Sequence, residues 1–442
     1  MFKTLFNALK VADLRKKLLV TLGLLIVFRF GSFITAPGVD GEALSEVMSA
    51  SSSSILTTIN VVTGGAFSQL SIFAMSISPY ITASIVIQLL TIAIPSLEEL
   101  SKEGEAGRRK IGKYTKYLAT VLGAVEAFGL YMTYRTSGVF LGESLIIPMM
   151  FILTLTAGST FLMWLADKIT SRGIGNGTSL LIFAGIISGL PSAVEYFWSQ
   201  LIMANGVFSL SGLLISLAVL IGAIILIAGV VWVTEAERRV PVQYAKRIVG
   251  RKMYGGQSTH IPIKLAMAGV MPVIFAMSLM QFPAMIIQLI NPNILSDTGF
   301  WAGVYKVCAF SSLAGSQDLW LYGIVHTVIY LALIALFTYF YTKMIFNTTE
   351  VANNLKKNGG FIPGIRAGKP TSDYLANILK YVSGFGSIFL GIIAVLPILV
   401  QFAGLQVSFG GTAILIVVSV ALESIKQLES QMLVRHYKGF LD

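Results

Sequence analysis

The hydrophobic and polar residues of this chain alternate in long blocks rather than at single positions. Apolar blocks are separated by clusters of charged residues, glycine and proline. About 20 consecutive apolar residues are needed for an α-helix to span the hydrocarbon core of a bilayer. The pattern predicts an all-α polytopic membrane protein with ten transmembrane helices, over residues 18–36, 72–94, 115–134, 145–166, 178–198, 211–233, 265–290, 319–342, 377–402 and 412–432.

The stretch from Asn60 to Pro95 departs from this block pattern. Gly64 and Gly65 precede an uncharged run, Ile72 to Ile94, that carries Pro79 in its interior. Glycine and proline weaken helices, and membranes tolerate such breaks where protein or a water-filled cavity satisfies the freed backbone groups. Two interpretations stay open here. One is a half-helix and a hinge before a spanning helix beside a cavity, and the other is an ordinary kinked spanning helix with an amphipathic lead-in.

Composition supports the membrane assignment. The chain has 442 residues, of which 55% are hydrophobic and 12% are charged, whereas a soluble domain has about 25% charged residues. The basic amphipathic start, residues 1–17, leads into a helix too long for the hydrophobic region of a cleavable signal peptide. The single cysteine, Cys308, excludes an intramolecular disulfide and a cysteine-built metal site.

Basic residues predict the orientation in the membrane. Of the 32 lysines and arginines, 29 lie in alternate connecting segments, and only Arg29, Arg135 and Lys306 lie elsewhere. Cytoplasmic loops of membrane proteins carry an excess of lysine and arginine. We therefore expect both termini in the cytoplasm, together with the basic segments 1–17, 98–117, 167–173, 234–264, 343–380 and 426–442. This topology accounts for the net charge of +11 without nucleic acid.

Two of the predicted cytoplasmic loops, 234–264 and 346–376, are longer than a connection requires. Loops of this length are usually functional or disordered. Basic loops also serve as anchors to anionic lipid, and that interpretation stays open. Within the first loop, apolar and polar residues alternate from Val240 to Val249, which predicts either a short hairpin or a helix extension.

The sequence offers little that resembles catalytic chemistry. The three histidines are far apart, and no nucleophile–base or metal-ligand spacing is present, which argues against an intramembrane enzyme. The glycine-rich turn after Arg172 leads into the next span, with Asn176 or Thr178 expected as its cap.

Ionisable residues within membrane spans are the usual signal of a transporter, and only Arg29, Glu126 and His326 are candidates. We expect Arg29 either to extend toward the membrane surface or to hydrogen-bond carbonyls near the outer end of the first span. The alternative function is a secondary transporter with a substrate site at a broken helix.

Several long strings carry a resemblance to a known family over essentially the whole chain. Besides residues 60–95, they are EGEAGRRKIGKYTKYL (103–118), MWLADKITSRGIGNGTSLLIFAGI (163–186), RRVPVQYAKR (238–247), STHIPIKLAMAGVMPVIFA (258–276), NNLKKNGGFIPGIRAGKPT (353–371) and FGGTAILIVVSVALESIKQLESQ (409–431). With these strings the chain closely resembles the SecY family, the channel subunits of the bacterial Sec protein translocase.

The resemblance implies an architecture and a function. It implies ten spans in two pseudosymmetric five-helix halves, 1–198 and 199–442, around an hourglass channel with a lateral gate between spans two and seven. The implied function is a passive protein-conducting channel in the bacterial cytoplasmic (inner) membrane. It would translocate unfolded secretory polypeptides and release hydrophobic segments into the bilayer, with no catalytic residue, metal or cofactor. The implied partners are SecE, SecG, the SecA ATPase, the ribosome, preproteins with signal sequences and membrane lipid.

The family pattern also implies particular site residues. A movable plug, a small helix over about residues 60–70, would include Thr63, Gly64, Gly65, Ala66, Phe67 and Ser68. A ring of aliphatic side chains would form the narrowest point of the channel, since such a ring excludes water and blocks ions. The matching residues are Ile77, Ile81, Ile182, Ile274 and Ile416, with Ile414 as the rival to Ile416.

The gate and the docking surface follow in the same way. Ile85 and Gln88 on span two and Met277 on span seven are the expected gate residues. The expected SecA and ribosome contacts are Arg238, Arg239, Lys246, Arg247, Arg251, Lys252 and Arg366. The chain departs from the family pattern at Ala367, at 347–349 and at Ala266, where many relatives carry an asparagine near the gate. The last departure puts the polar cluster of the gate in doubt.

Overall fold

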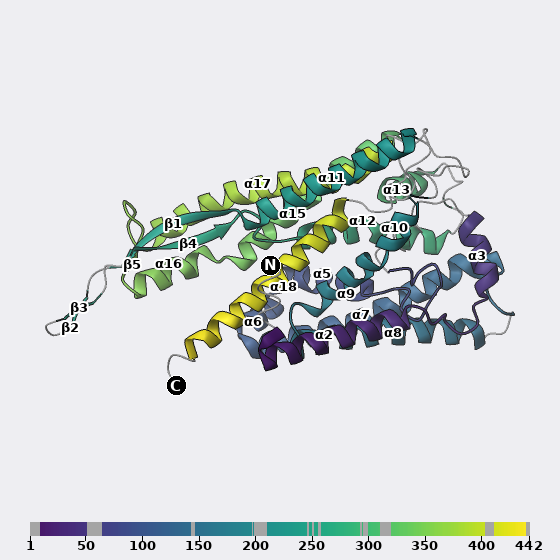
Figure 1. Ribbon diagram of the computed structural model, residues 1–442, viewed down its shortest axis with the longest axis horizontal. Helices are drawn as coiled ribbons and strands as arrows, with labels where there is room; N and C mark the ends of the chain where they lie inside the picture. The colour runs from purple at the N-terminus through teal and green to yellow at the C-terminus, as the bar shows by residue number, and fades with distance from the viewer. Residues whose placement is uncertain are drawn as a thin grey trace.

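The computed structural model is mostly helical, and its helices fall on the predicted apolar blocks (Figure 1). It describes residues 9–50, 64–142, 146–196, 198, 210–244, 247–249, 252–254, 258–291, 294, 299–309, 320–402 and 411–438.

The first part of the chain supplies one group of helices. They are α2 (Ala12–Gly31), α3 (Gly41–Ala50), α5 (Ser78–Ala93), α6 (Pro95–Lys102), α7 (Glu105–Tyr134), α8 (Ile146–Arg172), α9 (Gly177–Ser188) and α10 (Leu190–Tyr196). Asn176 caps α9, because its side-chain oxygen accepts hydrogen bonds from the backbone of Thr178 at 3.0 Å and of Ser179 at 3.4 Å. Of the two predicted caps, Asn176 is therefore confirmed.

The second part supplies the other helices and the strands. The helices are α11 (Leu210–Glu235), α12 (Met271–Ile290), α13 (Phe300–Cys308), α15 (Trp320–Ile345), α16 (Thr348–Lys357), α17 (Lys369–Phe402) and α18 (Gly411–Lys438). The strands are β1 (Glu237–Tyr244), β2 (Arg247–Val249), β3 (Lys252–Tyr254), β4 (Ser258–Lys264) and β5 (Gly360–Phe361). Helix α18 runs diagonally across the view and packs against α9, α11 and α17 (Figure 1).

A helix lies on each of the ten predicted spans. Within the described residues, five are long and apolar enough to cross a membrane by themselves. The pair α5 and α6 would be a sixth if it is one span, with a bend of 102° between its parts. The protein is thus a multi-pass membrane protein. The predicted count of ten spans is consistent with the positions of the helices, but length and hydropathy by themselves identify five or six spans among the described residues.

The second predicted span begins later than expected. We predicted it over 72–94 with Pro79 in its interior, but α5 starts at Ser78 and Pro79 lies in its first turn. Proline is well tolerated there, because the first helical N–H groups need no partner within the helix. Both earlier interpretations therefore need correction: Pro79 begins the helix instead of kinking it. The described part of the lead-in, residues 64–77, forms turns rather than a half-helix.

The all-α expectation also needs an addition, because the two long loops form a small sheet. Strand β1 pairs antiparallel with β4 on one side and with β5 on the other, with Val240 opposite Ile261 and Gln243 opposite Phe361. The alternation after Val240 thus belongs to a strand, and the alternative of a helix extension is wrong. The sheet lies beside α16 and α17 at one end of the molecule, and strands β2 and β3 extend beyond the helices there (Figure 1).

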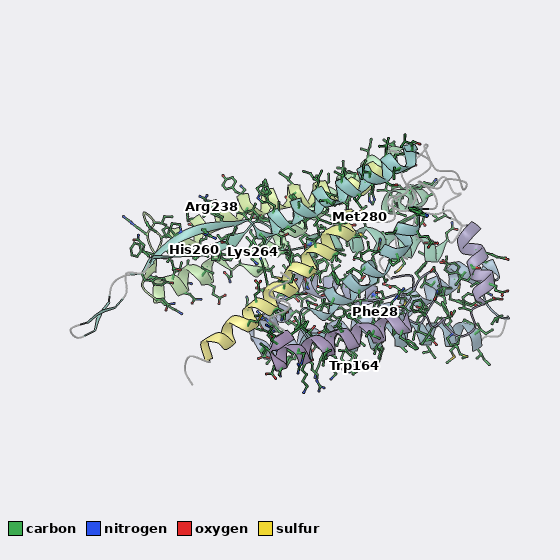
Figure 2. All side chains as sticks on the ribbon, in the orientation of Figure 1. Phe28, Trp164, Arg238, His260, Lys264 and Met280 are labelled. Carbon is green, nitrogen blue, oxygen red and sulfur yellow. The ribbon has the colours of Figure 1, made fainter. Side chains whose placement is uncertain are left out.

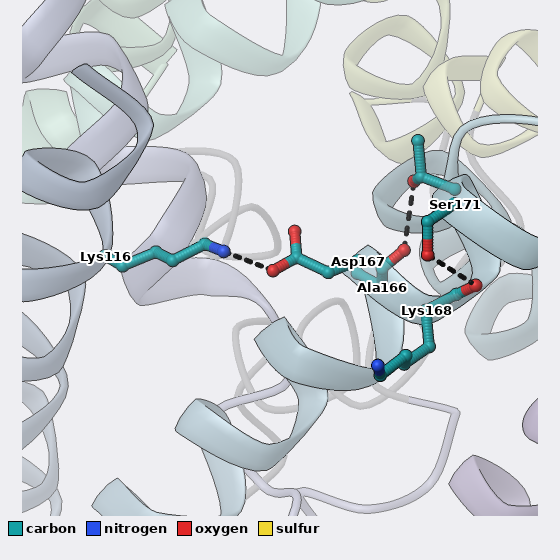
Figure 3. A network of polar contacts seen from close by, with 6 residues as sticks. Lys116, Ala166, Asp167, Lys168 and Ser171 are labelled. Carbon is teal, nitrogen blue, oxygen red and sulfur yellow. Dashed lines mark hydrogen bonds and ion pairs between the residues drawn. The ribbon is translucent and has the colours of Figure 1, made fainter. Parts of the chain in front are cut away.

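The largest hydrophobic core lies between the two groups of helices. It contains buried side chains from α5, α8 and α9 together with others from α12, α15, α17 and α18. A row of rings extends it: Phe28, Phe73, Phe161 and Trp164 have successive centroid distances of 6.2, 6.0 and 5.5 Å, and Phe28 and Trp164 are labelled in Figure 2. Ion pairs between the described residues lie on the surface by comparison. An ion pair between half-exposed Lys116 and Asp167 joins α7 to α8 (Figure 3), and exposed pairs of this kind contribute little to stability.

Candidate channel constriction, plug and docking surface

The five predicted constriction residues come from four helices and share one apolar cluster. Ile77, Ile182 and Ile416 are buried members of this cluster, and Ile81 and Ile274 pack against it half-buried. We name these five residues the isoleucine cluster. Ile416 is buried in the core cluster, whereas Ile414, its rival for this position, is half-buried and is not a member of that cluster.

Local structure explains how each isoleucine reaches the cluster. Ile77 precedes the first turn of α5, and its carbonyl accepts the backbone N–H of Ile81 at 3.1 Å, so the two side chains lie one turn apart. Ile274 lies in the first turn of α12, Ile182 lies within α9, and Ile416 lies near the start of α18. The cluster therefore forms near the N-terminal ends of all four helices.

The isoleucine cluster suits a seal better than a binding site. Aliphatic side chains offer no hydrogen bonds, so water and ions between them lose their hydration without replacement, and an apolar constriction closes by dewetting. For the same reason the cluster cannot bind the side chains of a passing polypeptide specifically. Within the described residues, no group of three or more histidine, cysteine, aspartate or glutamate side chains could hold a metal ion.

The predicted plug is described from Gly64 onward, and Thr63 lies outside the described residues. From Gly64 to Leu70 the backbone forms consecutive turns, and Ala66, Phe67 and Leu70 are buried. Gly65 and Ser68 are half-buried, and the Ser68 hydroxyl donates to the Gly65 carbonyl at 2.9 Å. We call residues 64–70 the turn segment. A small helix, which the family resemblance implied, is not present in this part.

Backbone pairing fixes the far end of the turn segment. The Ala36 amide donates to the Leu70 carbonyl at 3.0 Å, and the Ile72 amide donates to the Ile34 carbonyl at 2.9 Å. Phe67 packs into a second core with residues of α3, α7 and α8. The turn segment is therefore seated against the first group of helices.

Arg29 fixes the near end of the turn segment. Its guanidinium donates to the Gly64 carbonyl and, at 3.3 Å, to the hydroxyl of Ser188. Of the two sequence expectations for Arg29, hydrogen bonding to a carbonyl is the one that the structure contains.

His326, another ionisable residue within a span, is buried, and its Nδ1 lies 2.7 Å from the Val307 carbonyl.

The three predicted gate residues lie on helices that contact each other. Ile85 on α5 is buried in the main core, and Met277 on α12 packs against the same core. Gln88 accepts a hydrogen bond from the hydroxyl of Tyr341 on α15, and its amide nitrogen donates to Ser84 at 3.1 Å. Sequence reasoning missed Tyr341, because a single tyrosine in an apolar span has no recognisable partner until the helices are packed.

The predicted docking residues lie on and beside the small sheet. Arg238 and Arg239 are exposed on β1, and Figure 2 shows Arg238 with His260 and Lys264 along the paired strands. Arg247 and Lys252 belong to the β2–β3 hairpin, while Lys246 and Arg251 lie outside the described residues. The surface is basic, but some of its charge is compensated. Arg239 donates to Glu237 at 2.7 Å, and this bond holds the pKa of Glu237 below its ordinary value.

Arg366 is presented by a turn that is attached on both sides. Ile362 is buried in the core under the sheet and Ile365 packs against it, and their backbones are joined by a 3.0 Å hydrogen bond. The Arg366 carbonyl accepts a hydrogen bond from the Thr371 hydroxyl at 2.8 Å, while the Arg366 side chain is exposed.

At the other end of this loop, Asn347 caps α16. The departure from the family pattern at 347–349 thus still yields an ordered helix start.

Comparison with known proteins agrees with this geometry. A family model described as SecY matches residues 71–425. The chain is 42% identical to a protein translocase subunit SecY of Streptomyces coelicolor, over 98% of each chain. It is 44% identical to the protein of the same name of Halalkalibacterium halodurans, over all of both chains.

Solved structures share the fold. A structure described as a protein-conducting channel aligns with a TM-score of 0.65 and 21% identity, over 95% of this chain and 92% of that one. Sec61 from a canine ribosome–channel complex aligns with a TM-score of 0.63 and 19% identity, with the same coverage. The arrangement of helices is therefore that of known channel proteins.

Proposed function

This chain belongs to the SecY family, and we propose that the polypeptides it translocates pass through the isoleucine cluster. It is a protein-conducting channel subunit of the translocase and not an enzyme, so the secondary-transporter alternative is set aside. The observation that carries the proposal is that five aliphatic side chains from four helices, none of which can form a hydrogen bond, belong to or pack against one core cluster: Ile77, Ile81, Ile182, Ile274 and Ile416. The turn segment would act as the plug, and α5 and α12 would form the lateral gate.

The first test is ion conductance. Replacing Ile182 or Ile81 with asparagine places an amide in the cluster, which favours water there and removes the dewetting barrier. We expect each variant to conduct ions at rest in planar bilayers. The matched control is Ile221→Asn on α11, because Ile221 is exposed on a lipid-facing helix. Silent channels in both cluster variants would show that these residues do not form the constriction.

We further propose that the sheet and the Arg366 turn dock SecA or the ribosome on the cytoplasmic side, with SecE and SecG as further subunits in the bacterial inner membrane. The support is the exposed charge of Arg238 and Arg366 on an ordered scaffold. The excess of lysine and arginine in these loops supports a cytoplasmic location for this surface and for both termini.

The docking proposal is tested by Arg366→Glu. We expect SecA-driven translocation into reconstituted vesicles to fall severely, because a charge reversal against an acidic partner costs several kcal/mol. Arg366→Lys should be partly defective, since lysine lacks the planar fork of donors. Lys369→Glu, three residues further along the chain, is the control. Wild-type translocation by Arg366→Glu would identify this loop as a lipid anchor instead.

A further inference from the structure

Arg29 occupies an unusual position for a cation in this protein. It lies in the last turn of α2, inside an apolar span, whereas 29 of the 32 basic residues lie in the alternate basic loops. A charged side chain within a membrane span is costly, so such residues usually have a specific partner and a function. The orientation of the protein in the membrane does not require a positive charge at Arg29, so the reason for this charge is sought in its local contacts.

Three contacts supply that explanation. The Arg29 guanidinium donates to the Gly64 carbonyl, donates to the Ser188 hydroxyl at 3.3 Å, and lies 4.5 Å from the centre of the Phe33 ring. Ser188 is the last residue of α9, where the helix dipole is negative and attracts a cation. A carbonyl, a helix C-terminus and an aromatic face thus all favour a cation at this one point.

The turn segment is shaped to reach this cation. Gly64 has a φ of +68°, and a Cβ atom there would lie 2.4 Å from the Ser188 hydroxyl and 3.0 Å from the Gly185 backbone. Only glycine brings its backbone this close to α9, and that approach places the Gly64 carbonyl within reach of Arg29. Arg29 is thus the link between α2, α9 and the start of the turn segment.

The two ends of the turn segment are held by different means. Its far end is held by backbone hydrogen bonds between 34–36 and 70–72, which involve no side-chain atom. Its near end is held by the side chain of Arg29. Loss of the Arg29 side chain would release the near end and leave the far end attached. The turn segment could then move away from the helices as one unit.

We infer that Arg29 is the clasp that holds the turn segment in its seated position, by tying the Gly64 carbonyl to the C-terminal end of α9. The inference rests on the proposed role of the segment as the plug. Arg29 is a positioning residue in this scheme, since it acts on the channel through the segment. A translocating chain would have to displace the segment against this contact.

The test reads the position of the segment without using translocation. In a Cys308→Ser background, Ala66→Cys introduces a thiol at a position that is fully buried in the seated segment. Its rate of labelling by a membrane-impermeant maleimide is measured in vesicles containing the complete channel complex. We expect Arg29→Met to raise that rate about tenfold or more, because a hydrogen bond from a charged donor is lost.

The controls separate the clasp from general effects of charge and folding. Arg135→Met removes an exposed arginine at the end of α7, which also lies outside the six basic segments, and should leave the labelling rate unchanged. Arg29→Lys keeps the positive charge but loses the planar guanidinium with its several donors, and should give an intermediate labelling rate. Ser188→Ala removes one partner and should give a smaller rise, which keeps the test usable if Arg29→Met does not accumulate.

An unchanged labelling rate in Arg29→Met and Ser188→Ala would overturn the clasp. Resting ion conductance then distinguishes this failure from failure of the proposed function. A protected thiol together with leaking Ile182→Asn channels would overturn the clasp alone. An exposed thiol without any ion leak in Arg29→Met would support the clasp and overturn the role of the segment as a plug.

Discussion

The two groups of helices meet along two seams that are built differently. At the first, α18 meets α2 and α9: Lys17 donates to Gln431 at 3.0 Å, and the buried Gly175 amide donates to Gln427 at 2.6 Å. We call this the polar seam. At the second, which we call the apolar seam, α5 meets α12 through side chains such as Ile85 and Met277 in the main core. Between the described residues of α5 and α15 there is one hydrogen bond, from Tyr341 to Gln88.

This difference indicates which seam can open toward lipid. Apolar contacts are non-directional, so a hydrophobic helix that enters between α5 and α12 replaces them with equivalent contacts. A buried backbone amide such as that of Gly175 has no such substitute, and separating it from its partner leaves it unsatisfied. The apolar seam is therefore suited to be a lateral gate, and the polar seam is suited to be the hinge.

The largest expected effect comes from locking the apolar seam. In a Cys308→Ser background, a cysteine pair at Ile85 and Met277 should crosslink on oxidation and nearly abolish export of a preprotein, because a signal helix can no longer enter. Neighbouring pairs within one helical turn should be scanned. The measurement is export into vesicles before and after reduction, and recovery on reduction is expected.

The matched control locks the polar seam. Ile174 and Leu428 are both buried in a small cluster at that seam, and a cysteine pair there should leave most export intact. Equal inhibition by the two locked pairs would remove the distinction between gate and hinge. Efficient export through a fully oxidised Ile85–Met277 pair would exclude lateral opening between α5 and α12.

A smaller effect is expected from weakening the polar seam. Gln427→Leu leaves the buried Gly175 amide without its acceptor, which should cost about 1–3 kcal/mol of folding stability. We expect a lower midpoint of thermal unfolding in detergent, with an unchanged ratio of export between preproteins with strong and weak signal sequences. Gln431→Leu is the milder comparison, because its partner Lys17 can be solvated. A change in the export ratio with unchanged thermal stability would place the gate at this seam.

The smallest effect concerns the hydrogen bond from Tyr341 on α15 to Gln88 on α5, beside the apolar seam. Tyr341→Phe removes it at a cost of about 0.5–1.5 kcal/mol to the closed state. Export of a preprotein with a weakened signal sequence should therefore rise several-fold, while export with a strong signal changes little. The control is Tyr339→Phe, since Tyr339 is exposed on the same helix and contacts Lys343. No difference between the two variants would show that the bond does not help to hold the gate closed.

This bond also bears on Ala266, where the family pattern has an asparagine near the gate. Ala266 can form no side-chain hydrogen bond, and its carbonyl accepts from the Gly269 amide at 3.0 Å. A polar contact between α5 and α15 is nonetheless present, through Gln88 and Tyr341. The combined variant Gln88→Leu with Tyr341→Phe should behave like Tyr341→Phe alone, because both substitutions remove the same bond.

The sequence by itself determined the helices and the family. Each predicted span carries a helix, because a block of apolar residues long enough to cross a bilayer has few alternatives to a helix in lipid. The cap of α9 could be narrowed to Asn176 or Thr178 from the sequence, since capping depends on neighbours two and three residues away, and the structure identifies Asn176. The five isoleucines of the predicted constriction were chosen by matching to the family pattern, and their role remains a prediction.

Only the tertiary structure decided the contacts between distant segments. The alternation after Val240 fitted a strand or a helix until β4 and β5 were found to pair with it. Ile414 and Ile416 are two residues apart, and only the packing of α18 against its neighbours separates them. Arg29 with Gly64, and Gln88 with Tyr341, lie 35 and 253 residues apart. Local sequence sets local conformation through short-range sterics and hydrogen bonds, whereas these pairs exist only because the folded helices bring them within bonding distance.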